Sequence, residues 1–181
     1  LQKKVSIRIF HGVESDILAD GSLDYDTETL ASLDFVIGSI HSRFQMDKIA
    51  MTTRLEKALT NPFLTIWGHP TGRLLLGRKG YEFDWNVCLK AAKKNQVAIE
   101  INSHPQRLDV DWRMGSLLEK EKISVCIDPD AHDPKGINDT RFGEYMAEKA
   151  MLSSDQILNL MPVSEMEKYL WERKKKALSL V

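Results

Sequence analysis

Residues 63–70 read FLTIWGHP, a short apolar run that ends in a histidine. An apolar run of this length without alternation is typical of a strand buried on both faces of a parallel sheet. Four further runs have the same character, so we expect strands over residues 5–10, 35–40, 63–67, 97–101 and 123–127.

The segments between these runs have helical spacing. Residues 46–53 and 83–91 place apolar side chains at positions i, i+3, i+4 and i+7, and residues 112–122 can form a third helix. After the last strand, the chain is expected to be helical from about residue 138 onward. Strands that alternate with helices predict a parallel sheet of βαβ units, within a single α/β domain over residues 1–181.

The composition is that of one ordinary globular domain: the 181 residues are 43% hydrophobic and 28% charged, with a formal net charge of −1. This balance argues against a broad nucleic-acid or membrane surface, so any phosphate recognition must be local. The longest apolar stretches are too short to span a bilayer, and the N-terminus has no signal-peptide pattern. Cys88 and Cys126 lie in apolar segments and are expected to be buried thiols rather than a bridge or a metal pair, which fits a cytoplasmic protein.

Side chains that bind metals follow every expected strand, at intervals of about one βαβ unit. They are Glu14, His41, His69, Asn102, Asp130 and His132. Because the carboxyl ends of parallel strands meet at one edge of a sheet, we expect these groups to converge there. Imidazole and carboxylate ligands together favour zinc, manganese or iron, whereas calcium prefers oxygen ligands alone. A bridging carboxylate can also hold two ions about 3.5–4 Å apart, as phosphoester hydrolysis requires.

Several neighbouring residues have a competing structural interpretation. A single histidine at a strand end is more often structural, but three in equivalent positions favour ligands. For His11, packing beside the turn and metal binding both stay open, and His104 lies in a loop where structural roles are more common. Asp16 and Asp20 are expected to serve turn geometry. Asp128 competes with Asp130 as a ligand, but the proline between them suggests that Asp128 shapes the loop.

Five groups of residues resemble the PHP family of metal-dependent phosphoesterases. The resemblance is strongest to the PHP domain that follows the polymerase in bacterial and archaeal family X DNA polymerases. It extends to about residue 160, and the run from His69 to Leu75 is characteristic of the polymerase-linked branch. The matching segments are 12–23, 39–44, 68–75, 100–109 and 130–132.

This resemblance implies a distorted seven-stranded, TIM-like (β/α)7 barrel that holds up to three divalent metals and hydrolyses phosphoesters. The polymerase-linked branch is associated with removing nucleotides from DNA 3′ ends and with related repair nuclease or phosphatase steps. By resemblance, Glu14 bridges two metals and His41 and His69 complete one of the two sites. Asp130 joins the other site, and His132 serves a third.

The sequence also departs from the family pattern. The family opens with a His-x-His pair on its first strand and a further histidine on its second, and neither occurs here. The resemblance therefore implies an N-terminally truncated, incomplete barrel in which five parallel strands are present and the first two are missing. About one metal is then expected, with impaired activity and without the parent polymerase domain. The open sheet edge predicts a homodimer.

The predicted activity is hydrolysis of DNA or of a small phosphoester by water that metal ions activate. Glu14, Asp130 and Asn102 are the expected catalytic residues, with Asn102 positioning water or substrate. Guanidinium groups match phosphate oxygens, and the candidates are Arg43, Arg73 and Arg107, although each can instead belong to a structural ion pair.

Two other functions remain as alternatives. A non-catalytic PHP scaffold that binds a polymerase or DNA is favoured by the missing ligands. A metal-dependent isomerase or amidohydrolase on a related barrel is disfavoured, because it requires a lysine at a strand end and none is expected there.

Overall fold

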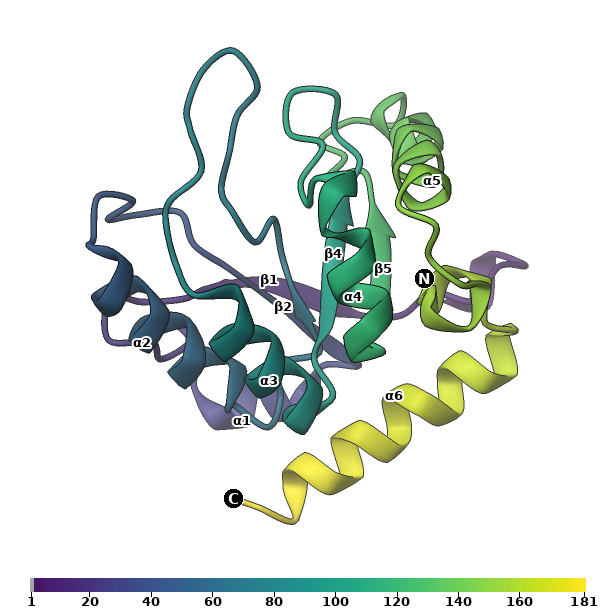
Figure 1. Ribbon diagram of the computed structural model, residues 1–181. Coiled ribbons are helices and arrows are strands. Elements are labelled where there is room, and N and C mark those ends of the chain that lie inside the picture. The colour runs from purple at the N-terminus through teal and green to yellow at the C-terminus, as the bar shows by residue number, and fades with distance from the viewer. Residues whose placement is uncertain (1) are drawn as a thin grey trace.

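Five parallel strands form the sheet of the computed structural model, which describes residues 2–181 (Figure 1). They lie in the order in which they occur along the chain, so each strand pairs with the next. The strands are β1 (Gly12–Asp16), β2 (Phe35–Ser39), β3 (Ile66–Trp67), β4 (Ala98–Asn102) and β5 (Val125–Asp128). Within residues 2–181, β1 and β5 are edge strands and the sheet does not close, which is consistent with an incomplete TIM-like barrel.

Helices connect and flank the strands, as the alternating pattern predicts. They are α1 (Thr27–Ser32), α2 (Lys48–Leu59), α3 (Trp85–Asn95), α4 (Gly115–Glu121), α5 (Thr140–Lys149) and α6 (Val163–Leu178). Short 3-10 helices cover Gln2–Lys4, Trp112–Met114, Gly136–Asp139, Ser154–Gln156 and Leu158–Leu160. The first three α-helices begin after an aspartate whose carboxylate accepts a hydrogen bond from the backbone of the first turn. These caps satisfy amide groups that have no partner inside the helix.

The prediction of a first strand over residues 5–10 is wrong. The segment has no regular structure, and Val5 and Ile7 are exposed there, so its apolar side chains have no sheet to pack against. The first strand is instead β1, whose Ser15 is fully buried although its sequence is largely polar. Glu14 therefore lies within a strand, beside Ile37 of β2, rather than after one.

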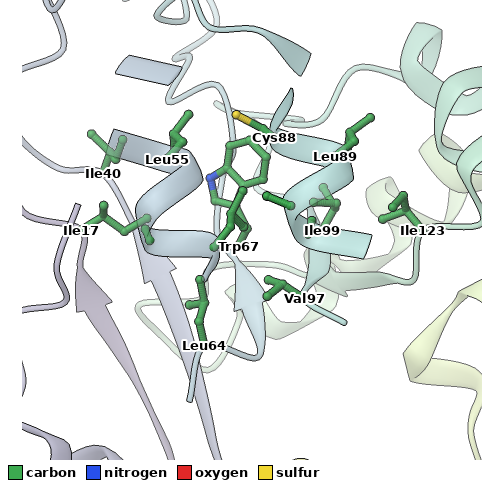
Figure 2. Packing of buried hydrophobic residues seen from close by; sticks show 14 of the residues in the cluster. Ile17, Ile40, Leu55, Leu64, Trp67, Cys88, Leu89, Val97, Ile99 and Ile123 are labelled. Carbon is green, nitrogen blue, oxygen red and sulfur yellow. The ribbon is translucent and has the colours of Figure 1, made fainter. Parts of the chain in front are cut away.

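The main core lies between the sheet and the paired helices α2 and α3. Figure 2 shows Trp67 of β3 among Leu55 of α2 and Cys88 and Leu89 of α3. The indole and the ring of Phe83 contact edge to face, with their centroids 5.3 Å apart, which adds to the benefit of burying both rings. Strand β3 is thereby fixed at the centre of the sheet.

Helix α6 crosses the amino ends of the central strands, opposite the strand ends that carry the candidate ligands (Figure 1). Arg173 donates hydrogen bonds to the carbonyl oxygens of Leu64 and Gln96, each of which lies two residues before the first residue of its strand, β3 or β4. Both cysteines are free thiols, although Cys126 is only partly buried. Across the described part of the chain, no helix combines the length and the apolar character needed to cross a bilayer.

Candidate metal centre

Three of the predicted ligands meet at the carboxyl ends of β1, β2 and β3. Glu14 lies on β1, while His41 and His69 each follow the last residue of their strand by two positions. The parallel pairing of β1 with β2 and of β2 with β3 brings the carboxyl ends of the three strands side by side. Glu14 Oε1 lies 3.1 Å from His69 Nε2 and 3.5 Å from His41 Nε2, and the two Nε2 atoms are 3.2 Å apart.

These separations suit a single transition metal. Two ligand atoms that each lie about 2.0–2.1 Å from one tetrahedral ion are about 3.3 Å apart. The side chain of His69 is only 2% exposed, whereas those of His41 and Glu14 are 38% and 40% exposed. The cluster is therefore closed on its inner side and open to solvent on the other.

Asp16 supports the cluster from behind His41. Its Oδ1 lies 2.5 Å from His41 Nδ1, while His41 Nε2 faces Glu14 and His69. Histidine ligands of metals usually donate their second ring proton to such a carboxylate, which fixes the tautomer and the ring orientation. We expected Asp16 only to serve turn geometry, and that prediction is wrong. A signal was present, because Glu14 and Asp16 are alternate residues and so lie on one face of β1.

The electrostatics of the cluster favour a cation. Hydrogen bonds from His41 and His69 hold the pKa of Glu14 far below its usual range, against the effect of burial. The same contact with Glu14 raises the pKa of His41 to about 9, with a further contribution from Asp16, although burial opposes it. Without a metal, the proton on His41 balances the carboxylates, and a bound ion has to displace it.

Asp130 and His132, which were also predicted as ligands, lie outside this cluster. Asp130 Oδ2 accepts hydrogen bonds from Arg107 Nε and Asn102 Nδ2, each at 3.2 Å. His132 has an exposed ring whose Nδ1 lies 2.7 Å from the carbonyl oxygen of Asp130. In residues 2–181, Glu14, His41 and His69 form the one group of three or more potential ligands.

Asn102 is fully buried at the end of β4. Its Nδ2 donates to Glu100 and to Asp130, and its Oδ1 accepts from the backbone of His104. The His104 Nδ1 in turn accepts from the backbone of Gln106, so this ring stabilises its own loop. Asn102 therefore links the carboxylates at the ends of β4 and β5.

The three arginines predicted to bind phosphate, Arg43, Arg73 and Arg107, differ in whether their guanidinium groups already have partners within the protein. Arg73 donates to Asp111 at 3.1 Å and to the carbonyl oxygen of Arg107 at 2.9 Å, and Arg107 itself pairs with Asp130. Arg43 is exposed, and its side chain forms no hydrogen bond or ion pair with the residues that the structure describes. Arg43 is therefore the member of the three that is free to meet a ligand.

A buried arginine that the sequence did not reveal holds the loop of His41. Arg54 is 2% exposed and donates to the carbonyl oxygens of Ile17, Leu18 and Ser42. These contacts join the end of β1 to the segment that carries His41. His11, in contrast, is exposed at the start of β1 and outside the cluster.

Two acidic groups lie behind the cluster, the buried Glu100 and the partly buried Asp128. Burial, with a contribution from Asp128, raises the pKa of Glu100 well above its usual value, although the carboxylate accepts a hydrogen bond from the backbone of His69. Burial also raises the pKa of Asp128. The wall behind His69 is therefore poor in water and unfavourable for further negative charge.

Comparisons with known proteins add to this geometry. The chain is 39% identical over 165 residues to the DNA polymerase/3′-5′ exonuclease PolX of Bacillus subtilis, which matches 91% of the chain but only 29% of that protein. It is 32% identical over 190 residues to a probable phosphatase of Thermoanaerobacter sp. (strain X514), covering 97% of the chain and 73% of the relative. A probable phosphatase of Vibrio campbellii is 35% identical over 121 residues, which are 65% of the chain and 45% of the relative. No family model matches the chain.

Proposed function

This chain belongs to the PHP family of phosphoesterase domains, and we propose that it supports metal-dependent hydrolysis of phosphoesters at the Glu14–His41–His69 cluster. Its relatives carry the names phosphatase and 3′-5′ exonuclease, and both names describe hydrolysis of a phosphoester. The observation that carries the proposal is the set of three ligand atoms at mutual separations of 3.1, 3.2 and 3.5 Å.

The chain's own residues have distinct parts in this proposal. Glu14, His41 and His69 bind the ion, and Asp16 holds His41 with its Nε2 toward the site. The burial of His69 keeps water away from the inner side of the cluster, so the reaction takes place on the exposed side. A zinc or manganese ion, or iron, would polarise a phosphoryl oxygen there and lower the pKa of attacking water.

The remaining predicted residues form a second part of the site. We propose that Asp130 and His132 serve further metal positions and that Asn102 positions water or substrate. The contact between Asn102 Nδ2 and Asp130 Oδ2 supports a shared position at this edge of the sheet. For phosphate oxygens we favour Arg43, because Arg73 and Arg107 are engaged in the ion pairs with Asp111 and Asp130.

We propose DNA 3′ ends as the substrate, since the PolX relative is named as a 3′-5′ exonuclease. The chain spans 29% of that protein, so small phosphoesters, which suit the probable phosphatases, form the other substrate class. A second candidate function is a non-catalytic scaffold that binds a polymerase or DNA. The ion pair between Asp130 and Arg107 favours it, because this pair has to break before Asp130 can join Glu14 in a two-metal site.

An assay with manganese separates these functions. The chain is incubated with a 3′-labelled single-stranded oligonucleotide and, separately, with a p-nitrophenyl phosphoester. Metal-dependent product that is lost in Glu14→Gln, and retained in the exposed-histidine variant His11→Ala, supports hydrolysis. Binding of the oligonucleotide without any turnover by wild-type protein supports the scaffold.

A further inference from the structure

The loop over residues 72–80, between β3 and α3, has an apolar tip that projects into solvent. The tip consists of Leu75 and Leu76, which are 42% and 111% exposed. Leu76 has a φ of 61°, a left-handed conformation that leucine rarely adopts and that turns usually assign to glycine or asparagine. A single exposed apolar residue needs no explanation, but two at the tip of such a turn indicate a surface that meets a partner.

Contacts within the protein hold the 72–80 loop in place. Leu74 and Arg78 pair as an antiparallel bridge, with N···O distances of 2.9 and 2.8 Å. The Arg78 guanidinium donates to the carbonyl oxygen of Gly72 and lies over the ring of Phe44, 3.9 Å from the ring centroid. Residues 73–80 also line a shallow hollow of about 380 Å³. The tip is therefore presented by an ordered loop, so a partner that binds it does not have to order the loop first.

The 72–80 loop stands at the same edge of the sheet as the ligand cluster. Figure 1 shows it in teal, where it rises beyond the carboxyl ends of the strands. Gly72 N donates to the carbonyl oxygen of His69 at 2.9 Å, and Leu76 follows Gly72 by four residues, which span at most about 14 Å. This length corresponds to about four nucleotides of a stacked strand, so one strand can reach both the cluster and the tip.

The neighbouring loop after β4 supports the 72–80 loop from one side. Leu75 N donates to the carbonyl oxygen of Gln106 at 2.7 Å. At the base of the loop, the carboxylate of Asp109 accepts hydrogen bonds from the backbone nitrogen and the hydroxyl of Thr71, both at 2.9 Å. Asp109 is fully buried, so it places no carboxylate on the exposed surface beside the tip.

The charges around the tip favour a polyanion. Residues 72–80 contain three basic residues and no acidic one, although the whole chain has a formal net charge of −1. Arg73 and Arg78 are engaged within the protein, whereas Lys79 is exposed and its side chain forms no hydrogen bond or ion pair in the described part of the chain. Arg43, on the loop after β2, is free in the same sense. In nucleic-acid complexes, such cations contact phosphates and apolar side chains insert beside bases.

We propose that the tip of the 72–80 loop is a DNA-binding wedge. Leu75 and Leu76 pack against bases near a DNA 3′ end, while Lys79 and Arg43 contact its phosphates. This inference rests on DNA as the proposed substrate and names the surface that holds the strand beside the cluster. Leucine has no group that reads the hydrogen-bonding pattern of a base, so the wedge accepts any sequence. A small phosphoester without a base does not engage it.

Binding of a short oligothymidylate, labelled at its 5′ end, tests the wedge in metal-free protein with chelator present, by fluorescence anisotropy. Leu76→Asn removes the apolar group and suits the positive φ, so it leaves the fold unchanged. We expect about 10-fold weaker binding in Leu76→Asn and near wild-type binding in Leu76→Met, which keeps an apolar side chain. The loss should vanish on a probe in which about four nucleotides at the 3′ end are abasic.

Lys79→Ala should weaken binding of both probes equally, because it removes a phosphate contact. It should also lower the slope of log Kd against log salt concentration by about 0.7. The matched controls are Leu180→Asn, at an exposed leucine, and Lys175→Ala on α6, which crosses the amino ends of the central strands. Both should bind the probes as wild type does.

Equal affinity of wild type and Leu76→Asn for the intact probe would overturn the proposal, and so would an equal loss on the intact and abasic probes. Self-association of wild type that Leu76→Asn abolishes, in protein that does not bind the probe, would assign the tip to a second copy instead. Because no metal is present, the two proposals fail separately. Binding that depends on Leu76, in protein that hydrolyses no phosphoester, refutes the proposed hydrolysis and supports the wedge. Hydrolysis of the p-nitrophenyl phosphoester by protein that does not bind the probe refutes the wedge alone.

Discussion

Asp16 and His41 form a direct contact across the first strand pair, with Asp16 Oδ1 at 2.5 Å from His41 Nδ1. The contact turns His41 Nε2 toward Glu14 and His69, so it links the edge strand to the orientation of a ligand. Asp16 therefore orients a side chain of the cluster without belonging to the cluster itself.

Asp16→Asn should weaken zinc binding about 10- to 100-fold. The amide group can donate a hydrogen bond to His41 Nδ1, which stabilises the tautomer with its proton on Nε2, and this tautomer has no Nε2 lone pair for the metal. Competition titration with a chromophoric chelator measures the loss. Asp20→Asn is the control, since Asp20 is exposed and pairs with Lys57 outside the cluster. Equal affinity in Asp16→Asn and wild type would show that the carboxylate has no influence on the ligand.

The pH dependence of metal-free stability should report the pair of Glu14 and His41. The folded pKa of His41 is raised from 6.5 to about 9, so its stabilising contribution is complete below pH 6.5 and is lost as pH rises through about 9. The pKa of Glu14 is lowered from 4.5, so its contribution is present above pH 4.5 and is lost on acidification. Urea unfolding with chelator present should show His41→Asn and wild type converging between pH 6.5 and 9. A constant difference across this window contradicts the pairing.

Metal affinity should rise over the same window. A divalent ion has to displace the proton of His41, so binding releases a proton until the pH exceeds about 9. Calorimetry in buffers of different ionisation enthalpy measures the released proton. Binding without proton release at neutral pH would mean that His41 is not a ligand.

Glu100 should tolerate loss of its charge but not of its shape. Its pKa is raised by burial, so the folded state keeps a proton that the unfolded chain loses above pH 4.5, and stability falls as pH rises from there. Glu100→Gln removes this dependence and should be at least as stable as wild type at neutral pH. Glu100→Ala leaves the buried backbone nitrogen of His69 without its acceptor and should cost about 1–3 kcal/mol in the free energy of unfolding. A marked loss in Glu100→Gln would show that the charge is needed.

Arg54→Ala should lower both stability and metal affinity. The change removes donors from Ile17, Leu18 and Ser42, and charged hydrogen bonds contribute about 1.5–3 kcal/mol each when buried. Arg54→Lys keeps the positive charge but lacks the planar set of guanidinium donors. It should therefore restore only part of the stability and zinc affinity that Arg54→Ala loses. Chemical denaturation and zinc titration together test this prediction. A variant with wild-type stability but weak zinc binding would show that Arg54 positions the loop of His41 without contributing to the free energy of unfolding.

The sequence predicted the four later strands well because each is largely apolar, and β2, β3 and β4 also lie inside the sheet. The first strand was misplaced for a physical reason: residues 5–10 have high β-propensity, but β1 is an edge strand that buries Ser15 and keeps Glu14 partly exposed. Pairing with β2 decides its position, and periodicity does not report such pairing.

The clustering of Glu14, His41 and His69 could be predicted because these residues lie on or just beyond neighbouring strands, where the backbone fixes their positions. Asp130 could not be placed in the same way. It belongs to a loop, has a φ of 50°, and engages Arg107 and Asn102. The buried contacts of Arg54 and Asp109 depend on loops that meet only in the folded chain, so no local sequence pattern indicates them.

The measurement that tests the central claim most directly is the metal content of the chain after purification without chelators. We predict about one zinc or manganese per chain, lost in His69→Ala and retained in His11→Ala. No bound metal in wild type after addition of zinc or manganese, or equal metal content in His69→Ala, would contradict the assignment of Glu14, His41 and His69 as a metal centre.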